Sequence, residues 1–262
     1  MNAKMLAHNV KVQAQKLLHR FGWHISTYNP MMLEDDSYEV QKRILVGHDV
    51  NTIFDVGAWV GISALSYSEN FPLAKVHVFE PFPESFDKMS SAVSVNNMIT
   101  AVNLAVTDTN GKATFYSNNN ETTNSLLPSA VNNTKTDFFR QQVQEIEVDT
   151  VTLDSYCQQH NVDKINILKM DVQGGELKAL AGAAKLLETQ SIDLIYCEVN
   201  FTRQYEESPL YHDIAIYLEK YGYRMFNFSD LITNERGELA YGDAIFYSPR
   251  IYEKWLSRNK VK

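Results

Sequence analysis

The chain has 262 residues, of which 44% are hydrophobic, and this is enough to bury the core of one large α/β domain. Its 24 basic and 32 acidic residues give a formal net charge of -8, which argues against a nucleic-acid-binding surface, because such a surface needs clustered cations. No apolar stretch is long enough to span a bilayer, the polar start is unlike a secretory signal, and Cys157 and Cys197 provide no disulfide framework. We therefore predict a cytoplasmic protein without a nucleic-acid partner.

The first part of the chain is predicted to be helical. Apolar residues recur at helical spacing over residues 1–20, and the absence of aromatic anchors favours packing on the domain or on a second copy of the chain over membrane binding. A homodimer is therefore left open. Residues 36–49, "DSYEVQKRILVGHD", predict a second helix that Gly47 ends. We assign residues 1–48 to an N-terminal helical extension and 49–262 to the main domain.

Strands and helices then alternate, which predicts a mostly parallel sheet with helices on its faces. The apolar, β-rich runs and the segments with helical spacing follow one another as strand 52–57, helix 62–71, strand 74–81, helix 83–96 and strand 99–106.

The middle of the chain interrupts this alternation. Residues 111–118, "GKATFYSN", and 144–154, "QEIEVDTVTLD", each read as a strand and suit an antiparallel addition. Between them, "NNNETTNSLLPSAVNNTK" is a polar stretch rich in Asn, Thr and Ser. A loop of this length in a compact domain is usually functional or mobile.

The alternation resumes after residue 154 and continues to the end of the chain. The predicted elements are helix 155–161, strand 165–172, helix 174–189, strand 192–199, helix 208–222, and strands 223–228 and 243–249, which close the chain.

The stretch "TIFDVGAWVG" at residues 52–61 ends the first of these strands in a glycine-containing turn. Gly57 and Gly61 allow a sharp turn close to a ligand, and the following helix points its N-terminal amides in the same direction. Glu80 ends the neighbouring strand, where a carboxylate accepts the hydroxyl groups of a ribose in nucleoside-binding sheets. One glycine of the dinucleotide pattern G-x-G-x-x-G is missing, which disfavours an NAD-dependent oxidoreductase without excluding it.

The glycine turn and Glu80 resemble the first two motifs of class I methyltransferases that use S-adenosylmethionine (SAM). "DVGAWVG", "VFEPFPESF", "VNLAVTDTNGKATF", "EIEVDTVTLDSY", "INILKMDVQGGELKALAGA" and "IDLIYCEVNF" occur in an order that resembles the FkbM family over about residues 37–248. This resemblance implies a Rossmann-like α/β fold with seven strands, the last reversed. It also implies SAM as methyl donor and a hydroxyl acceptor on a sugar, glycan or secondary metabolite. Trp59 and Gln173 depart from the family pattern, which has Asn and Glu there, and they leave a non-catalytic SAM-binding module open.

From the motifs and the resemblance we predict a set of donor-binding residues. Asp55, Gly57, Ala58 and Gly61 form the loop, and Glu80 binds the ribose. By resemblance, Asn103 and Ala105 lie near the adenine. Phe82 either packs against the adenine or belongs to the core. Asp171, at the end of its strand, is expected beside the sulfonium.

Carboxylates at the strand ends are the candidates for chemistry. An alcohol is a poor nucleophile while protonated, so Asp171 with Glu198 or His212 is predicted to accept the proton, although a place on a helix surface is the simpler explanation of His212. Alternatively, Asp171 and Glu198, with Glu176 facing the same cleft, hold a divalent metal such as Mg²⁺ through their oxygens. Compensation of the helix N-terminal dipole explains Glu176 equally well. Lys169 is expected on the opposite face of its strand.

The acceptor is expected to bind next to the donor. The polar loop at 117–136, with Asn124 and Ser125, and the segment 200–212 are predicted to line its site.

Overall fold

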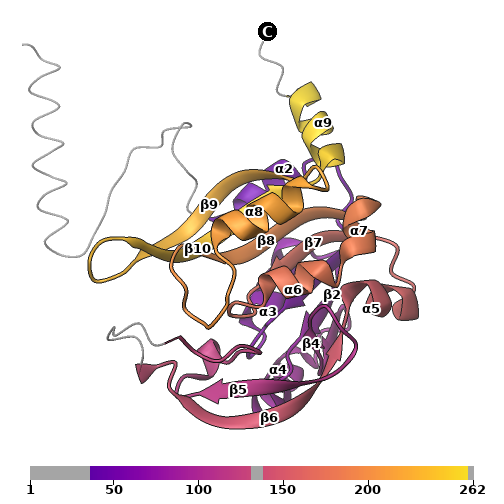
Figure 1. Cartoon of the computed structure of the whole chain (residues 1–262). Helices are drawn as coiled ribbons and strands as arrows, with labels where there is room; N and C mark the ends of the chain where they lie inside the picture. The colour runs from indigo at the N-terminus through magenta and orange to yellow at the C-terminus, as the bar shows by residue number, and fades with distance from the viewer. Residues whose placement is uncertain (1–35, 131–137, 259–262) are drawn as a thin grey trace, which may run out of the picture. The chain divides into compact units, whose positions relative to one another are not determined.

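The computed structural model describes residues 36–130 and 138–258, so the helix predicted over residues 1–20 lies outside the described residues. Seven strands form one sheet (Figure 1), and in order across it they are β3 (Ile99–Val102), β2 (Lys75–Phe79), β1 (Thr52–Val56), β7 (Ile165–Met170), β8 (Ile192–Asn200), β10 (Leu239–Tyr247) and β9 (Arg224–Thr233). Neighbouring strands are parallel except at β10, which is antiparallel to both β8 and β9. The predicted class I methyltransferase fold, with its last strand reversed, is confirmed.

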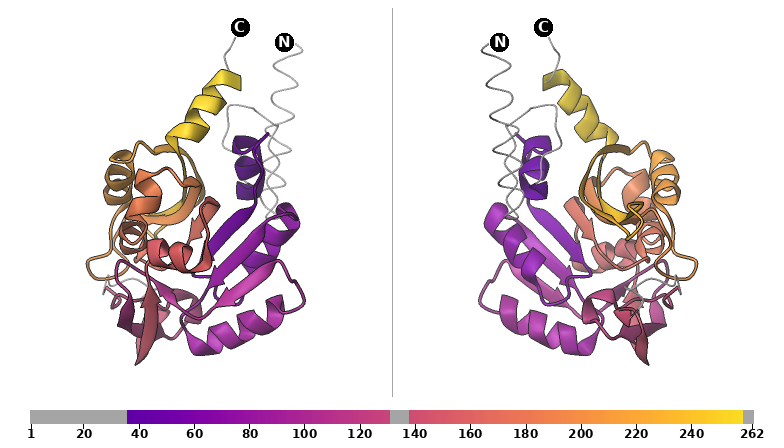
Figure 2. Two further views of the ribbon diagram at one scale, coloured as in Figure 1. Left: turned by 90° about the vertical axis from the view of Figure 1, so that its right-hand side faces the viewer. Right: turned by 90° about the vertical axis from the view of Figure 1, so that its left-hand side faces the viewer.

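Helices cover both faces of this sheet (Figures 1 and 2). The core on one face includes residues from α2 (Ser37–Ile44), α3 (Ile62–Asn70), α4 (Pro83–Val93) and α9 (Pro249–Arg258). The core on the other face includes residues from α5 (Leu153–His160), α6 (Glu176–Ala181), α7 (Ala184–Glu188) and α8 (Tyr211–Glu219). Every residue of β7 is buried, as expected for a central parallel strand covered on both sides.

A second, three-stranded sheet lies beside the end of β2. It consists of β4 (Ala105–Val106), β6 (Gln142–Val151) and β5 (Gly111–Asn118), and β5 pairs antiparallel with β6 as predicted. A short 3₁₀ helix, η1 (Glu121–Thr123), follows β5. The small core of this sheet contains Phe82, Phe115 and Val148, and so joins the sheet to the start of α4.

Three predicted elements differ from the structure. The strand predicted over 99–106 is broken into β3 and β4, and at the break the side-chain amide of Asn103 donates to the carbonyl oxygens of Glu80 (2.8 Å) and Pro81 (3.2 Å). The helix predicted over 174–189 is broken at Gly182, where a Cβ would lie 2.1 Å from the carbonyl oxygen of Thr107. The chain was predicted to end in strands, but α9 follows β10.

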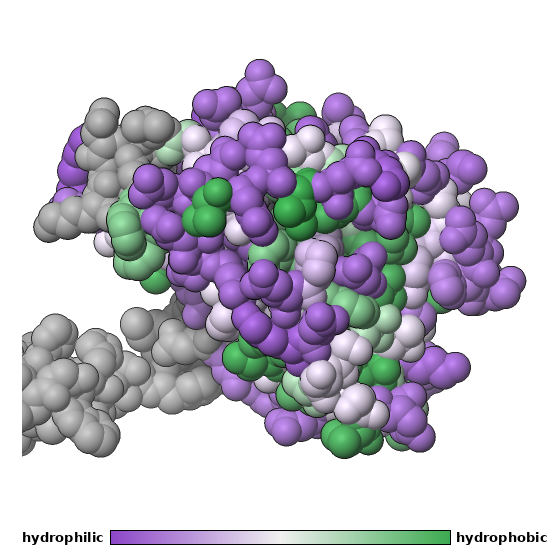
Figure 3. All heavy atoms as spheres, turned by 90° about the horizontal axis from the view of Figure 1, so that it is seen from below, coloured by the Kyte–Doolittle hydropathy of each residue, from purple (hydrophilic) through white to green (hydrophobic). Residues whose placement is uncertain are grey.

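The surface of the described residues is ordinary for a domain of this size. Figure 3 shows the face seen from below in Figure 1, to which β5 and β6 belong; it is mostly hydrophilic, with separate small hydrophobic patches. Phe138 and Val143 are among the exposed apolar residues of the chain. No helix in residues 36–130 and 138–258 is long and apolar enough to cross a membrane.

Candidate functional site

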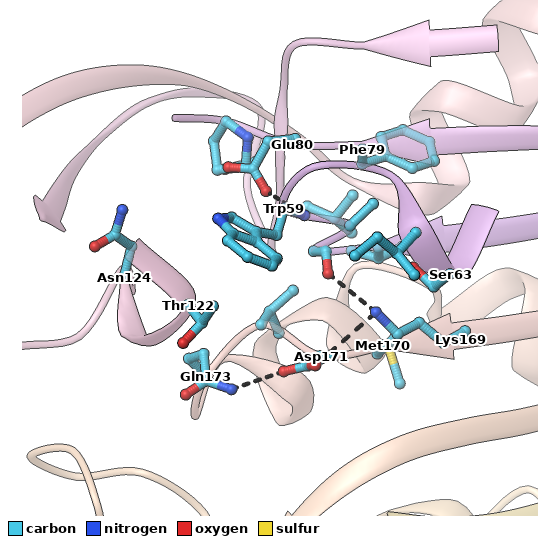
Figure 4. Close-up of a pocket in the computed structure, with 18 of the residues that line it drawn as sticks. Trp59, Ser63, Phe79, Glu80, Thr122, Asn124, Lys169, Met170, Asp171 and Gln173 are labelled. Carbon is cyan, nitrogen blue, oxygen red and sulfur yellow. Dashed lines mark hydrogen bonds and ion pairs between the residues drawn. The ribbon is translucent and has the colours of Figure 1, made fainter. Parts of the chain in front are cut away.

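A cavity of about 470 Å³ lies at the carboxyl ends of β1, β2 and β7 (Figure 4). Its volume is in the range of small-molecule sites. β1 lies between β2 and β7, which places the glycine turn, Glu80 and Asp171 at neighbouring strand ends. This is the edge of an open α/β sheet at which ligands bind.

The turn after β1 is held tightly between its two neighbours. Gly57 has φ +77°, and a Cβ on it would lie 1.9 Å from the carbonyl oxygen of Asp171. The backbone N–H groups of Gly57 and Ala58 donate to the carbonyl oxygen of Phe79, at 3.0 and 3.2 Å. Only glycine fits this position, because the conformation is left-handed and the opposing backbone is in contact.

Glu80 lines the cavity with a carboxylate that the backbone holds in place. Its Oε2 accepts the N–H of Trp59 and its Oε1 accepts the N–H of Phe82, both at 2.9 Å. Burial raises the pKa of Glu80 to about 7, and the two N–H groups oppose this increase. Each carboxylate oxygen has a second lone pair, so the group is able to accept two further hydrogen bonds.

The structure separates the predicted donor-binding residues into two groups. Those that line the cavity are Gly57, Ala58, Glu80, Ala105 and Asp171. The others lie behind its wall: Asp55 accepts from Ser63 at 2.5 Å, Phe82 stacks on Phe115 with ring centroids 6.2 Å apart, Asn103 supports the turn after Glu80, and Gly61 precedes α3.

Sequence reasoning missed most of the apolar wall near Glu80. Phe79, Leu104, Val106, Phe115 and Leu126 line this part of the cavity. Leu104 and Val106 flank the predicted Ala105, but Phe115 and Leu126 come from the small sheet and the polar loop. Their contribution depends on how that sheet packs, and no local motif marks it.

Trp59, one of the two departures from the family pattern, lies in the middle of the cavity (Figure 4). Its φ of 50° is in the left-handed region, and its side chain is 37% exposed. The indole Nε1 donates to Oε2 of Glu121 at 3.4 Å, and Glu121 is paired with Lys88 at 2.9 Å. The indole therefore stands between the Glu80 side of the cavity and the side that contains Asp171.

Asp171 and Glu198 are brought together by Gln173, the second departure. Nε2 of Gln173 donates to Oδ1 of Asp171 at 2.7 Å and to Oε2 of Glu198 at 3.1 Å. Its Oε1 accepts the hydroxyl of Tyr205 at 2.7 Å. Burial, followed by the nearby charge of Asp171, raises the pKa of Glu198 well above its usual value. Asp171, with 42% of its side chain exposed, is the accessible carboxylate of the pair.

The expectation that three carboxylates share one cleft is wrong. Oε1 of Glu176 accepts the backbone N–H groups of Val172 (3.0 Å) and Gly174 (3.3 Å), and burial raises the pKa of Glu176 to about 7. Within the described residues, no group of three or more His, Cys, Asp or Glu side chains is placed to hold a metal ion. Asp171 and Glu198 were the predicted metal ligands. The side-chain amide of Gln173 lies between their carboxylates and donates to both.

Lys169 was predicted on the opposite face of its strand, and this is also wrong. Its Nζ lies 3.1 Å from Oδ1 of Asp55, 3.0 Å from the carbonyl oxygen of Gly57 and 4.0 Å from Oδ2 of Asp171. Burial alone lowers the pKa of Lys169, but the charges of Asp55 and Asp171 outweigh it and the pKa is raised. Residues two apart on a strand share a face, so Lys169 and Asp171 point the same way.

His212 is not among the residues that line this cavity. It lies on α8 with 64% of its side chain exposed, and its Nε2 is 3.6 Å from Oδ1 of Asp213. The sequence placed it close to the end of β8, but the helix carries it to the surface.

Comparison with known proteins shows the family to which this chain belongs. The family model described as the methyltransferase FkbM domain matches residues 55–225, which include the glycine turn, Glu80, Asp171 and Glu198. The chain belongs to the FkbM methyltransferase family. FkbM membership argues against the dinucleotide oxidoreductase that the sequence left open.

Curated relatives of this FkbM chain are also methyltransferases by name. The chain is 26% identical over 160 residues to 2-O-methyltransferase NoeI of Sinorhizobium fredii (strain NBRC 101917 / NGR234), covering 59% of this chain and 65% of that protein. It is 25% identical over 162 residues to Methyltransferase 1 of Beauveria bassiana (strain ARSEF 2860), covering 56% and 62%. The matches thus span less than two thirds of either relative. Among solved structures, precorrin-6y C5,15-methyltransferase of Geobacter metallireducens GS-15 matches with a TM-score of 0.44 and 10% identity, over 85% of this chain and 93% of that one.

Proposed function

We propose that the protein transfers a methyl group from SAM to a hydroxyl group of a sugar, glycan or secondary metabolite. The observation that carries this proposal is the junction of Gly57, Glu80 and Asp171 at one cavity. Family membership supports the methyl transfer, and the 2-O-methyltransferase NoeI supports a hydroxyl acceptor. That relative is distant, so the acceptor class depends chiefly on the chemistry of the site.

The cavity fits the adenosine half of SAM. Glu80 has acceptor capacity for both ribose hydroxyls, and its backbone donors fix its orientation. The apolar side chains of Phe79, Ala105 and Leu126 offer the adenine a buried surface. The backbone at Gly57 has no side chain that would keep a ligand away.

Asp171 is the residue we assign to the acceptor hydroxyl. When bound, SAM supplies a methyl group that its sulfonium already activates, so the protein must chiefly orient the acceptor oxygen and remove its proton. Burial raises the pKa of Glu198 and so favours its protonated form, and we therefore assign the proton acceptor to Asp171, the more exposed carboxylate of the pair. Gln173 fixes Oδ1 of Asp171, so the carboxylate presents one orientation to the substrate.

A second cavity of about 610 Å³ is our candidate for the acceptor site. Thr122 of η1 lines both cavities, so the second adjoins the donor cavity. Phe139 and Tyr241 give it aromatic surface, and side-chain amides and hydroxyls give it neutral hydrogen-bonding groups. Two residues of each charge, Arg140, Arg236, Glu235 and Glu238, also line it. The residues it takes from the two segments that the sequence predicted are Asn120, Thr122, Thr123, Thr202 and Gln204. This mixture suits a molecule with apolar faces and several hydroxyl groups.

Two measurements on the full chain test the proposal. Calorimetry should show binding of SAM and no binding of NAD. Release of S-adenosylhomocysteine should be detected with a panel of hydroxylated sugars, glycosides and polyketide alcohols. Asp171→Asn should lower kcat by about 100-fold to 10,000-fold, the usual contribution of a general base, and leave SAM affinity nearly unchanged.

Asp163→Asn is the control, because Asp163 is an exposed acid that lines neither cavity. It should retain full turnover. An Asp171→Asn enzyme with normal turnover and normal SAM binding would contradict the role of Asp171, and absence of SAM binding by the wild type would contradict the function itself.

A further inference from the structure

A row of polar side chains crosses the sheet on the face that α2 and α3 cover. Asp55 on β1 is the register neighbour of Lys169 on β7, and Lys169 is the register neighbour of Tyr196 on β8. The hydroxyl of Tyr196 donates to Oδ2 of Asp243 on β10 at 2.6 Å. The faces of a covered parallel sheet are normally apolar, and burying charge there is costly. A buried row of this kind needs an explanation.

The charges along this row are not balanced. Lys169 is paired with Asp55 and bonded to the carbonyl oxygen of Gly57. Asp243 makes no ion pair with any residue in 36–130 or 138–258, and its hydrogen bond comes from the neutral hydroxyl of Tyr196. Burial raises the pKa of Asp243 to about 6, while the hydroxyl of Tyr196 and the charge of Lys169 oppose this increase, so the carboxylate is mostly ionised at neutral pH. Lys169 is in contact with Asp55 and not with Asp243, and a buried carboxylate that no cation contacts favours a positively charged ligand group.

The unbalanced carboxylate faces the donor cavity. Asp243, Tyr196 and Lys169 all line it, together with Ser37 and Tyr38 of α2. Glu80 follows β2, and β1, β7 and β8 separate that strand from β10. One cavity therefore has a carboxylate suited to a diol at one end and a carboxylate suited to a cation at the other.

We propose that Asp243, oriented by Tyr196, binds the α-ammonium group of the methyl donor. This rests on the proposed function, since the primary ammonium of SAM lies on the amino-acid end, on the other side of the sulfonium from the ribose diol. Asp243 comes from the reversed strand near the end of the chain, beyond residues 55–225 that match the family model. It is a binding residue that neither the glycine turn nor the family match indicates.

The binding of three nucleosides tests whether Asp243 contacts the ammonium group or another part of the ligand. SAM and S-adenosylhomocysteine carry the amino-acid end, whereas 5′-methylthioadenosine has the same adenosine and sulfur but ends in a methyl group. Calorimetry on the full chain should show that Asp243→Asn weakens binding of SAM and S-adenosylhomocysteine by about 10-fold to 100-fold, the loss typical of a hydrogen bond to a charged group. The affinity for 5′-methylthioadenosine should change by less than about 2-fold, which also shows that the variant is folded.

Two further variants act as controls. Tyr196→Phe removes the hydroxyl that orients Asp243. It should weaken the binding of SAM and S-adenosylhomocysteine less than Asp243→Asn does. Asp163→Asn changes an exposed acid that lines neither cavity and should leave all three affinities unchanged. Unchanged SAM affinity in Asp243→Asn, or an equal loss for 5′-methylthioadenosine, overturns the proposal. A wild-type protein that binds none of the three nucleosides overturns the proposed function as well.

Discussion

Gly57 and Asp171 meet backbone to backbone, because a Cβ on Gly57 would lie 1.9 Å from the carbonyl oxygen of Asp171. The N–H of Asp171 also donates to the carbonyl oxygen of Val56 at 2.9 Å. The turn that faces the donor and the strand end that carries the candidate base are therefore one rigid unit. A change at either residue is transmitted to the other.

Gly57→Ala should accordingly destabilise the protein strongly. The left-handed φ of +77° alone costs an alanine about 1–2 kcal/mol. The clash with a backbone carbonyl adds to this, so we expect a loss of more than about 3 kcal/mol in the free energy of unfolding by urea. Backbone atoms on both sides leave no flexible side chain to move away.

Gly237→Ala is the control for this prediction. Gly237 has φ +80°, and a Cβ there would meet nothing within 4 Å. It should cost only the conformational penalty of about 1–2 kcal/mol. If Gly57→Ala and Gly237→Ala lowered the free energy of unfolding equally, the clash with the carbonyl oxygen of Asp171 would not contribute to the loss of stability.

The parts of the site that could be predicted are those encoded by local pattern. The alternation of strands and helices gave the parallel sheet, and the turn at Gly57 with Glu80 at the next strand end gave the position of the cavity. Asp171 was found because an acid that ends an apolar strand is unusual. Each of these signals lies within a few residues of sequence, and the order of strands then brings them to one edge.

The features of the site that could not be predicted depend on contacts between segments that are distant in the sequence. The face of Lys169 follows from its two-residue spacing to Asp171, but nothing local shows that β7 places Lys169 beside Asp55 of β1. The short loop before His212 suggested a place near the site, but the helix phase exposes it. Asp243 was overlooked because β10 reaches the cavity only by insertion between β8 and β9.

SAM affinity should depend on the ionisation of Glu80. Burial raises its pKa to about 7, and the carboxylate is a better acceptor for ribose hydroxyls than the protonated acid. As the pH falls below about 7, the ionised fraction falls and the Kd for SAM should rise, approaching 10-fold per pH unit. Glu80→Gln should weaken SAM binding by about 10-fold to 100-fold at pH 8 and remove the dependence near pH 7, leaving only the rise in Kd that protonation of Asp243 causes as the pH falls below about 6.

Glu121→Gln provides the comparison for Glu80. Glu121 also lines the cavity, but its hydrogen bond from Lys88 lowers its pKa, so it does not change charge near pH 7. The Kd of this variant, measured by calorimetry between pH 5.5 and 8.5, should keep the wild-type pH dependence. A flat wild-type profile would show that Glu80 does not contact the ribose as an ionised group.

Gln173→Glu should raise the pKa of Glu198 further. The substitution replaces the amide that donates to Asp171 and Glu198 with a third carboxyl group, and like charges disfavour ionisation. We expect the carboxyl signal of Glu198 to titrate at a higher pH than in the wild type in carbon-detected NMR. The same variant should bind Mg²⁺ more tightly than the wild type, because three oxygen ligands then share one place.

Gln173→Asn separates charge from shape in this experiment. Asn tolerates the left-handed conformation at this position, where φ is 53°, but its side chain is too short to bridge the two carboxylates. It should weaken the bridge without adding a charge beside Glu198, so the pKa of Glu198 should rise less than in Gln173→Glu. If Gln173→Glu left the titration of Glu198 unchanged, the side chains at 173 and 198 would not be coupled in solution.

Lys169→Met should destabilise the protein because it leaves Asp55 buried without a cation. Asp55 is fully buried, and its Oδ1 faces Nζ of Lys169 at 3.1 Å. Removing one partner of a buried pair typically costs about 3–5 kcal/mol. The double variant Lys169→Met with Asp55→Asn should recover part of this loss, since the uncompensated charge is then gone.

Lys164→Met tests whether any lysine paired with a buried aspartate has this effect. Lys164 lies 2.6 Å from Oδ2 of the buried Asp193, but Asp193 is also paired with Arg250 and accepts from Asn166. Because Asp193 keeps these partners, Lys164→Met should lower the free energy of unfolding by urea by less than about 1.5 kcal/mol. The double variant Lys169→Met with Asp55→Asn should be compared with Lys169→Met alone. If the two are equally stable, the unpaired buried charge of Asp55 is not the cause of the lower free energy of unfolding.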